Sequence, residues 1–175
     1  PGMIGDSGDS SDTTAANITG PSGSAGDATG ATSITENTTT IHSFTANETV
    51  SWSLNGGADA SKFSIDSSTG ALSFLAAPDY ENPADNGLNN EYIVIVRATD
   101  NGSNTSDQTV TVTVTNVDDT NPLIQGDTGS AGSASSTKTV SENQTTIHTF
   151  TADETVTWSL NGGADASKFS INSST

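Results

Sequence analysis

Carboxylates dominate the side chains of this sequence that could build a functional site. The 175 residues contain 21 Asp and Glu, 4 Lys and Arg and 2 His, and the formal net charge is −17. The absence of cysteine excludes disulfides and thiolate metal sites, and two histidines leave little for acid–base or nucleophilic catalysis. Excess negative charge destabilises a compact fold unless cations neutralise part of it, and oxygen-rich sites prefer hard cations such as Ca²⁺. The composition therefore favours a cation-binding protein over an enzyme.

The negative charge also restricts the possible partners. It repels phosphate backbones and anionic lipid surfaces, so we expect no binding to nucleic acid or to a membrane surface. No apolar run approaches the ~18 residues of a membrane-spanning helix, so we expect no membrane insertion. The first residues show no basic-then-apolar signal peptide, and export would have to be encoded elsewhere.

The elements that must position the carboxylates are encoded in a repeat. Trp52–Ile65 returns unchanged as Trp158–Ile171, and around it Ile18–Thr69 matches Ile124–Thr175 at about two-thirds of the positions. The second copy stops halfway through the repeated unit. Because the differences are mostly exchanges among small polar residues, we expect a tandem array of similar modules and not one active site.

The alternation of apolar and polar residues predicts the strands of the module. The expected strands are 33–35, 40–46, 50–54, 63–65, 72–74, 91–99 and 110–114, with a bend or single helical turn at 55–61 and a long acidic loop at 76–90. Seven short strands without a helical period predict an all-β fold, a seven-stranded antiparallel Greek-key sandwich repeated in tandem. The paired cysteines of the immunoglobulin family itself are missing. We expect an acidic, Gly/Ser-rich lead-in and linker (1–31), a complete module (32–122), and a linker plus half module (123–175).

Five motifs, in this order, resemble a bacterial cadherin repeat. They are Glu36-Asn37, Phe63–Asp66 followed by Thr69–Leu72, Asp79-Tyr80-Glu81, Arg97–Asp100 and Asn116–Pro122. The resemblance covers nearly all of 32–122 and, as far as the second copy extends, 138–175. It implies a cadherin-like sandwich, with calcium bound at the junction between successive repeats.

The resemblance also implies which residues hold that calcium. They are Glu36, Asp79 and Glu81, the linker residues Asp118 and Asp119, and Asp153 of the next module. Carboxylates gathered from distant stretches repel one another, and a divalent cation with six to eight oxygen ligands removes that repulsion. Asp100 matches a ligand that serves the junction on the other side of its own module, where Asp9 or Asp12 would be its partner.

The linker departs from the family pattern Asp-x-Asn-Asp-Asn-x-Pro at Asn116, Asp118 and Thr120. We therefore expect fewer ions per junction than in animal cadherins. Two simpler interpretations remain open. Asp79 and Glu81 could belong to a solvated loop, and Asp118 and Asp119 could form an acidic linker kept soluble by its charge.

We interpret the chain as a non-catalytic, calcium-binding structural and adhesion repeat of a long bacterial protein that is extracellular, either secreted or held at the cell surface. Its expected partners are neighbouring repeats of the same protein. One alternative is a carbohydrate-binding module whose ligands are glycans, for which Tyr80 and Trp52 are the available aromatic residues, although Trp52 is expected in the core. Another is completion of the half repeat by other copies, through strand exchange in a filament.

Overall fold

The computed structural model describes residues 13–175, which form two compact units, one ending at Val117 and one spanning Asp118–Thr175. Each unit is described on its own. The start of the expected lead-in, including Asp9 and Asp12, lies outside the described residues. No helix in the described part of the chain is long and apolar enough to cross a bilayer.

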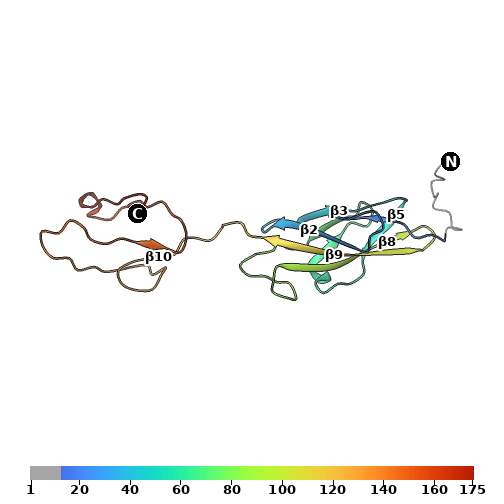
Figure 1. The fold of residues 1–175 in the computed structure, drawn as a ribbon, viewed down its shortest axis with the longest axis horizontal. Coiled ribbons are helices and arrows are strands. Elements are labelled where there is room, and N and C mark those ends of the chain that lie inside the picture. Colours follow the sequence, from blue (N-terminus) through green and yellow to red (C-terminus); the bar gives the residue numbers. More distant parts are fainter. Residues whose placement is uncertain (1–12) are drawn as a thin grey trace. The chain divides into compact units, whose positions relative to one another are not determined.

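The first unit is a sandwich of two sheets, as the alternating sequence pattern predicts (Figure 1). One sheet has the strand order β2-β9-β8-β5 and the other the order β3-β7-β6, while β1 and β4 form a separate pair. The bounds are β1 (Ile18–Thr19), β2 (Thr29–Thr35), β3 (Thr40–Ser43), β4 (Thr45–Ala46), β5 (Val50–Leu54), β6 (Phe63–Ile65), β7 (Ala71–Phe74), β8 (Glu91–Asp100) and β9 (Thr105–Thr115). A 3-10 turn, η1 (Ala60–Lys62), begins within the bend expected at 55–61.

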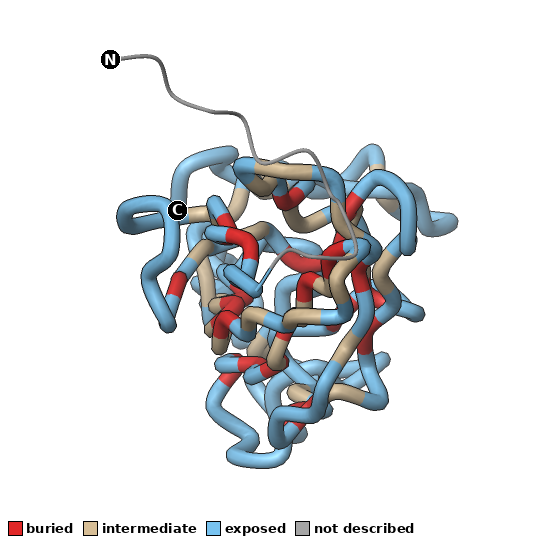
Figure 2. Tube along the Cα trace, turned by 90° about the vertical axis from the view of Figure 1, so that its right-hand side faces the viewer, coloured by how far each residue is buried: buried red, intermediate tan, exposed pale blue. Residues whose placement is uncertain are grey.

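Apolar side chains at alternate strand positions fill the space between the sheets. In β9, Val110, Val112 and Val114 are buried while the threonines between them are partly exposed, and Figure 2 marks such buried positions in red. Full burial of each such side chain stabilises the fold by about 1.5–3 kcal/mol. Trp52 is only 6% exposed, which confirms its expected place in the core. The core consists of Ile18, Phe44, Trp52, Phe63, Leu72, Phe74, Tyr92, Val94, Val96, Ala98, Val110, Val112 and Val114.

Neighbouring strands pair antiparallel, as expected, except that β2 pairs with β9 in parallel. The reason lies in the number of times the chain runs along the module. There are seven such passes, if β1 with β2 and β3 with β4 count as one pass each. With an odd number of alternating passes, the first and the last run in the same direction, so they can be neighbours only as a parallel pair.

The same count decides which loops share an end of the unit. The chain enters at one end, and the turn after β2, the loop after β7 and the exit after β9 all lie at the other, which we call the exit end. The turn between β8 and β9 lies at the entry end. Side chains that follow β2, β7 and β9 can therefore meet, although they are far apart in the sequence.

Residues that we placed in the lead-in belong to the sandwich. Ile18 is 2% exposed, and all of β1 and the start of β2 fall within residues 1–31. Gly20 and Gly30 lie against the fully buried Gln108, whose Nε2 donates to the carbonyl oxygen of Asp27 at 2.9 Å, and a Cβ on either glycine would press on that amide. The glycines thus reflect close packing over β9, which local composition did not distinguish from a loose linker.

The second unit contains β10 (Ile124–Gln125) paired antiparallel with β11 (Thr151–Ala152), and the 3-10 turn η2 (Ala166–Lys168). These elements repeat β1, β4 and η1 at the same sequence offset. Its apolar side chains are far more exposed, since Phe169 is 52% exposed and its counterpart Phe63 only 4%. In the first unit β2 pairs with β9 and β5 pairs with β8, and residues 118–175 contain no counterparts of β8 and β9. The second unit therefore forms only the elements whose hydrogen-bond partners also lie within it, which are β10 with β11 and the turn η2.

Supplying the missing strands is expected to convert the second unit into a sandwich. Thr175 matches Thr69, so a second copy of residues 70–117 would follow it directly. In a Trp52→Phe background, which leaves Trp158 as the only tryptophan, this extension should shift tryptophan emission to shorter wavelength, because Trp158 becomes buried like Trp52. The same extension with aspartate at the copies of Val94 and Val96 is the control and should not shift it. A blue shift in both chains, or in neither, would contradict this account.

Candidate metal centre

Three carboxylates converge at the exit end of the first unit. Glu36, Asp79 and Glu81 each offer one oxygen atom, and these atoms lie within 4.8 Å of one another. Glu36 directly follows β2, and the other two flank Tyr80 in the loop after β7. The structure therefore brings together three of the residues that the sequence resemblance implied as ligands.

Glu36 is the buried member of this cluster, with 3% of its surface exposed. Its Oε1 accepts the backbone N–H of Val117 and its Oε2 that of Tyr80, both at 2.7 Å. These hydrogen bonds lower the pKa of Glu36 below its usual value because they stabilise the ionised form, and the bond from Val117 has the larger effect. One anionic side chain thus connects the end of β2, the loop after β7 and the exit after β9.

Asp79 and Glu81 are exposed, and each accepts a hydrogen bond from a neighbour. The Asp79 Oδ1 accepts the backbone N–H of Asn82 at 3.0 Å, and the Glu81 Oε1 accepts from the Asn116 Nδ2 at 2.6 Å. Among the described residues, Lys and Arg form ion pairs only with Asp107 and Asp127, so no basic side chain neutralises the cluster. The negative charge at this point is partly screened by amide donors and remains available to a cation.

The cluster fits a hard cation by size and by donor type. Calcium binds carboxylate oxygens at about 2.3–2.6 Å, so two oxygens on one ion are separated by at most about 5 Å. The oxygens of Glu36, Asp79 and Glu81 satisfy that limit without rearrangement. Three carboxylates are fewer than the six to eight oxygen ligands that calcium prefers, so water or further residues would have to complete such a site.

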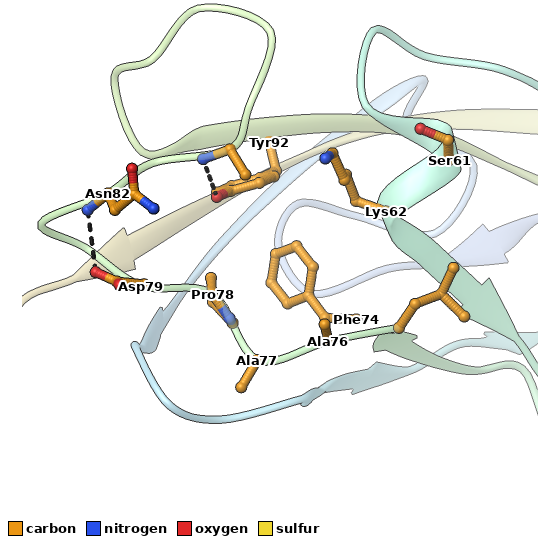
Figure 3. Close-up of a pocket in the computed structure, with 11 residues that line it drawn as sticks. Ser61, Lys62, Phe74, Ala76, Ala77, Pro78, Asp79, Asn82 and Tyr92 are labelled. Atoms are coloured by element: carbon orange, nitrogen blue, oxygen red, sulfur yellow. Dashed lines mark hydrogen bonds between the residues drawn. The ribbon is translucent and has the colours of Figure 1, made fainter.

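A cavity of about 300 Å³ lies beside the cluster (Figure 3). Apolar side chains, including Phe74, Pro78 and Tyr92, form much of its wall, and Asp79 lies at its edge with Asn82.

A sugar-binding platform would need exposed aromatic rings. Trp52 is buried in the core, and Tyr80 is 38% exposed. The two aromatic residues that we considered for glycans do not form a joint platform.

Another sequence-predicted ligand lies at the opposite end of the first unit. Asp100 ends β8 at the entry end, is 6% exposed, and accepts the backbone N–H and the Nδ2 of Asn104, each at 2.8 Å. It closes the turn between β8 and β9, away from Glu36. Its suggested partners, Asp9 and Asp12, lie outside the described residues.

Asp118, Asp119 and Asp153 belong to the second unit. There the Asp153 Oδ1 accepts the backbone N–H of Leu123 at 2.8 Å. Burial raises the pKa of Glu154, and the nearby carboxylates of Asp118 and Asp153 raise it further. Glu154 was not among the ligands that we carried over, although its position directly after Asp153 was a usable signal. Asn116 was noted only as a departure from the linker pattern, and the structure shows it bound to Glu81.

Replacement of Glu36 should change how stability depends on pH. A carboxyl group whose pKa is lowered by folding stabilises the protein above its unfolded-state pKa, near 4.5, and this contribution is lost as the pH falls through the folded-state value. Without added calcium, the melting temperature of the parent chain should therefore fall more steeply below about pH 4.5 than that of Glu36→Gln. Glu91→Gln, which changes an exposed glutamate, is the control and should follow the parent profile. Parallel acid limbs in all three chains would contradict the assignment.

Comparisons with known proteins agree with the observed fold. The family model of the cadherin domain matches residues 27–115. Over 85 residues the chain is 40% identical to human Protocadherin Fat 1, an alignment that covers 47% of this chain and 2% of that protein.

Solved structures show the same fold. Repeats EC22–24 of mouse Cadherin-23 have a TM-score of 0.51 at 21% identity, covering 64% of this chain and 36% of theirs. Repeats EC21–23 of human CDH23 have a TM-score of 0.50 at 21% identity, and the match covers 79% of this chain and 43% of that one. The chain thus spans less than half the length of the proteins it matches. Because the family model matches half of its residues, this chain belongs to the cadherin family.

Proposed function

We propose that this chain is a non-catalytic, calcium-binding cadherin repeat that stiffens a longer extracellular protein. The observation that carries the proposal is the convergence of Glu36, Asp79 and Glu81 at the end where the chain leaves the repeat. An ion held there would lie beside the segment that leads into the next repeat. The bacterial, secreted or surface-held parent belongs to the same proposal, as do neighbouring repeats as its partners.

Chain connectivity supports the linker residues as additional ligands. The backbone N–H of Val117 donates to Glu36, so Asp118 and Asp119 follow directly after a residue that is fixed to the cluster. Asp153 and Glu154 supply further carboxylates in the second unit, where burial first, and then the nearby Asp118 and Asp153, raise the pKa of Glu154. Asp118, Asp119 and Asp153 are proposed as further calcium ligands of this chain, as the sequence resemblance implies.

The energetic effect would be large for a domain of this size. A ligand present at a hundredfold excess over its dissociation constant stabilises the folded state by about 2.7 kcal/mol. The total stability of a single domain is only about 5–15 kcal/mol, and here the high negative charge opposes compaction. Binding at the exit end would restrict the hinge between repeats and so convert a flexible joint into a stiff one.

Calcium should raise the melting temperature of the chain. In a Trp158→Phe background, Trp52 fluorescence should report a rise in the melting temperature of the first unit in 2 mM calcium relative to EDTA, by roughly 4–8 °C for each kcal/mol of stabilisation. The double variant Asp79→Asn with Glu81→Gln should lose this rise, because it removes two charged ligands. Asp66→Asn, in the exposed turn before β7, is a matched control and should keep it. Equal midpoints in calcium and EDTA for the parent chain would remove calcium from the account.

Asn116→Asp should strengthen calcium binding. The Asn116 amide donates to Glu81, and an aspartate there would remove the donor and add a fourth carboxylate. Greater ligand charge raises calcium affinity, on the order of tenfold here. Without calcium the added repulsion should lower the melting temperature, so that the variant is less stable than the parent in EDTA and gains more from calcium. Calorimetric titration would measure the calcium affinity, and thermal melts would measure the stability in EDTA and in calcium. A calcium-induced rise in melting temperature no larger than the parent's would contradict this reasoning.

A further inference from the structure

The loop between β7 and β8 is held by buried acidic side chains outside the proposed calcium cluster. Asp85 is 2% exposed and Asp59 is 4% exposed. The Asp85 carboxylate accepts the backbone N–H groups of Gly87, Asn89 and Asn90, at 2.9–3.0 Å. The Asp59 carboxylate accepts those of Asn86 and Ile93, at 2.6 and 2.8 Å. These bonds fix the turn 85–90 against the start of β8.

Asn90, the last residue of this loop, connects the turn to the carboxylate cluster. It is 8% exposed, and its Nδ2 donates to the carbonyl oxygen of Tyr80 at 3.0 Å. The N–H of Tyr80 donates in turn to the Glu36 Oε2 at 2.7 Å. Tyr80 is therefore held from both sides, by Asn90 through its carbonyl group and by Glu36 through its N–H group. Asp79 and Glu81 flank this residue.

The backbone conformation at Asn90 does not by itself require an asparagine side chain. Its backbone is left-handed, with φ of 63°, a conformation that glycine adopts more readily than any other residue. Its Oδ1 is buried and has no hydrogen-bond partner among the described residues. A glycine would fit this backbone without burying an acceptor. The side chain does have one specific contact, the hydrogen bond to Tyr80.

We propose that Asn90 is a positioning residue for the calcium ligands Asp79 and Glu81, an inference that rests on the proposed function. By fixing the Tyr80 carbonyl, Asn90 holds the two flanking carboxylates beside Glu36 before an ion arrives. Ligands that are already in place lose less conformational freedom on binding, so affinity rises without any contact between Asn90 and the ion. Residues that orient metal ligands in this way typically change metal affinity by about 10–100-fold when they are replaced.

The test uses the full chain with Tb³⁺ as a luminescent substitute for calcium, excited through Tyr80. Asn90→Gly keeps the left-handed backbone and removes the donor, so we expect about tenfold weaker Tb³⁺ and calcium binding. Luminescence lifetimes in H₂O and D₂O should show about one additional bound water, because a displaced carboxylate leaves a coordination position open. Asn89→Gly is the matched control. Asn89 lies in the same turn, is exposed, and its Nδ2 donates to Glu91 instead of Tyr80, so binding should be unchanged.

The outcomes separate the two proposals. If the parent chain binds neither ion, the proposed function fails and the role of Asn90 fails with it. If the parent binds and Asn90→Gly keeps the parent affinity and lifetime, the proposed function stands and the positioning role is overturned. Equal weakening by Asn89→Gly would also overturn it, because the effect would then come from the turn as a whole. Should circular dichroism show that Asn90→Gly is unfolded, Asn90→Ala, which also lacks the donor and adds no charge, decides by the same criteria.

Discussion

The buried carboxylate of Glu36 is the interaction on which the exit end of the first unit depends. It accepts the backbone N–H groups of Tyr80 and Val117, which follow it by 44 and 81 positions in the sequence. One side chain thus fixes three segments. A guanidinium partner would also have satisfied a buried carboxylate, but it would have cancelled the charge. Because the donors are neutral amides, Glu36 stays ionised and the cluster keeps its negative charge. The same bonds that order the loop therefore preserve its attraction for a cation.

The parity of the strands is the constraint that makes this end a junction. Seven passes carry the chain from one end of the unit to the other, and the parallel pairing of β2 with β9 is the structural sign of that odd number. An even number of passes would return the chain to the end where it entered, and consecutive repeats could not follow one another head to tail. Acidic side chains such as Glu36 therefore lie at the end where the chain leaves the unit.

Much of the fold could be predicted from local patterns, because alternation of apolar and polar residues is visible without a partner. It located β5, β8 and β9 within a few residues. It missed β1 and the start of β2, where Gly20 and Gly30 owe their identity to the side chain of Gln108, about 80–90 residues away in sequence. For the site, the resemblance indicated Glu36, Asp79 and Glu81, which the structure brings together, and Asp100, which it places at the opposite end. Asn90 gave no signal, since its importance lies in one long-range hydrogen bond to a backbone carbonyl.

The chain contains its own demonstration of why local pattern is insufficient. Trp52–Ile65 and Trp158–Ile171 have the same sequence and therefore the same intrinsic propensities. Both copies form the 3-10 turn, η1 and η2, which needs only hydrogen bonds between near neighbours. Only the first copy forms β5 and β6, because those strands require β8 and β7 as partners. Sequence decides directly the elements that close within a few residues, whereas a strand forms only where its pairing partner is present. The same holds for the candidate site, whose ligands come from separate segments and acquire a shared geometry only through the sandwich that joins them.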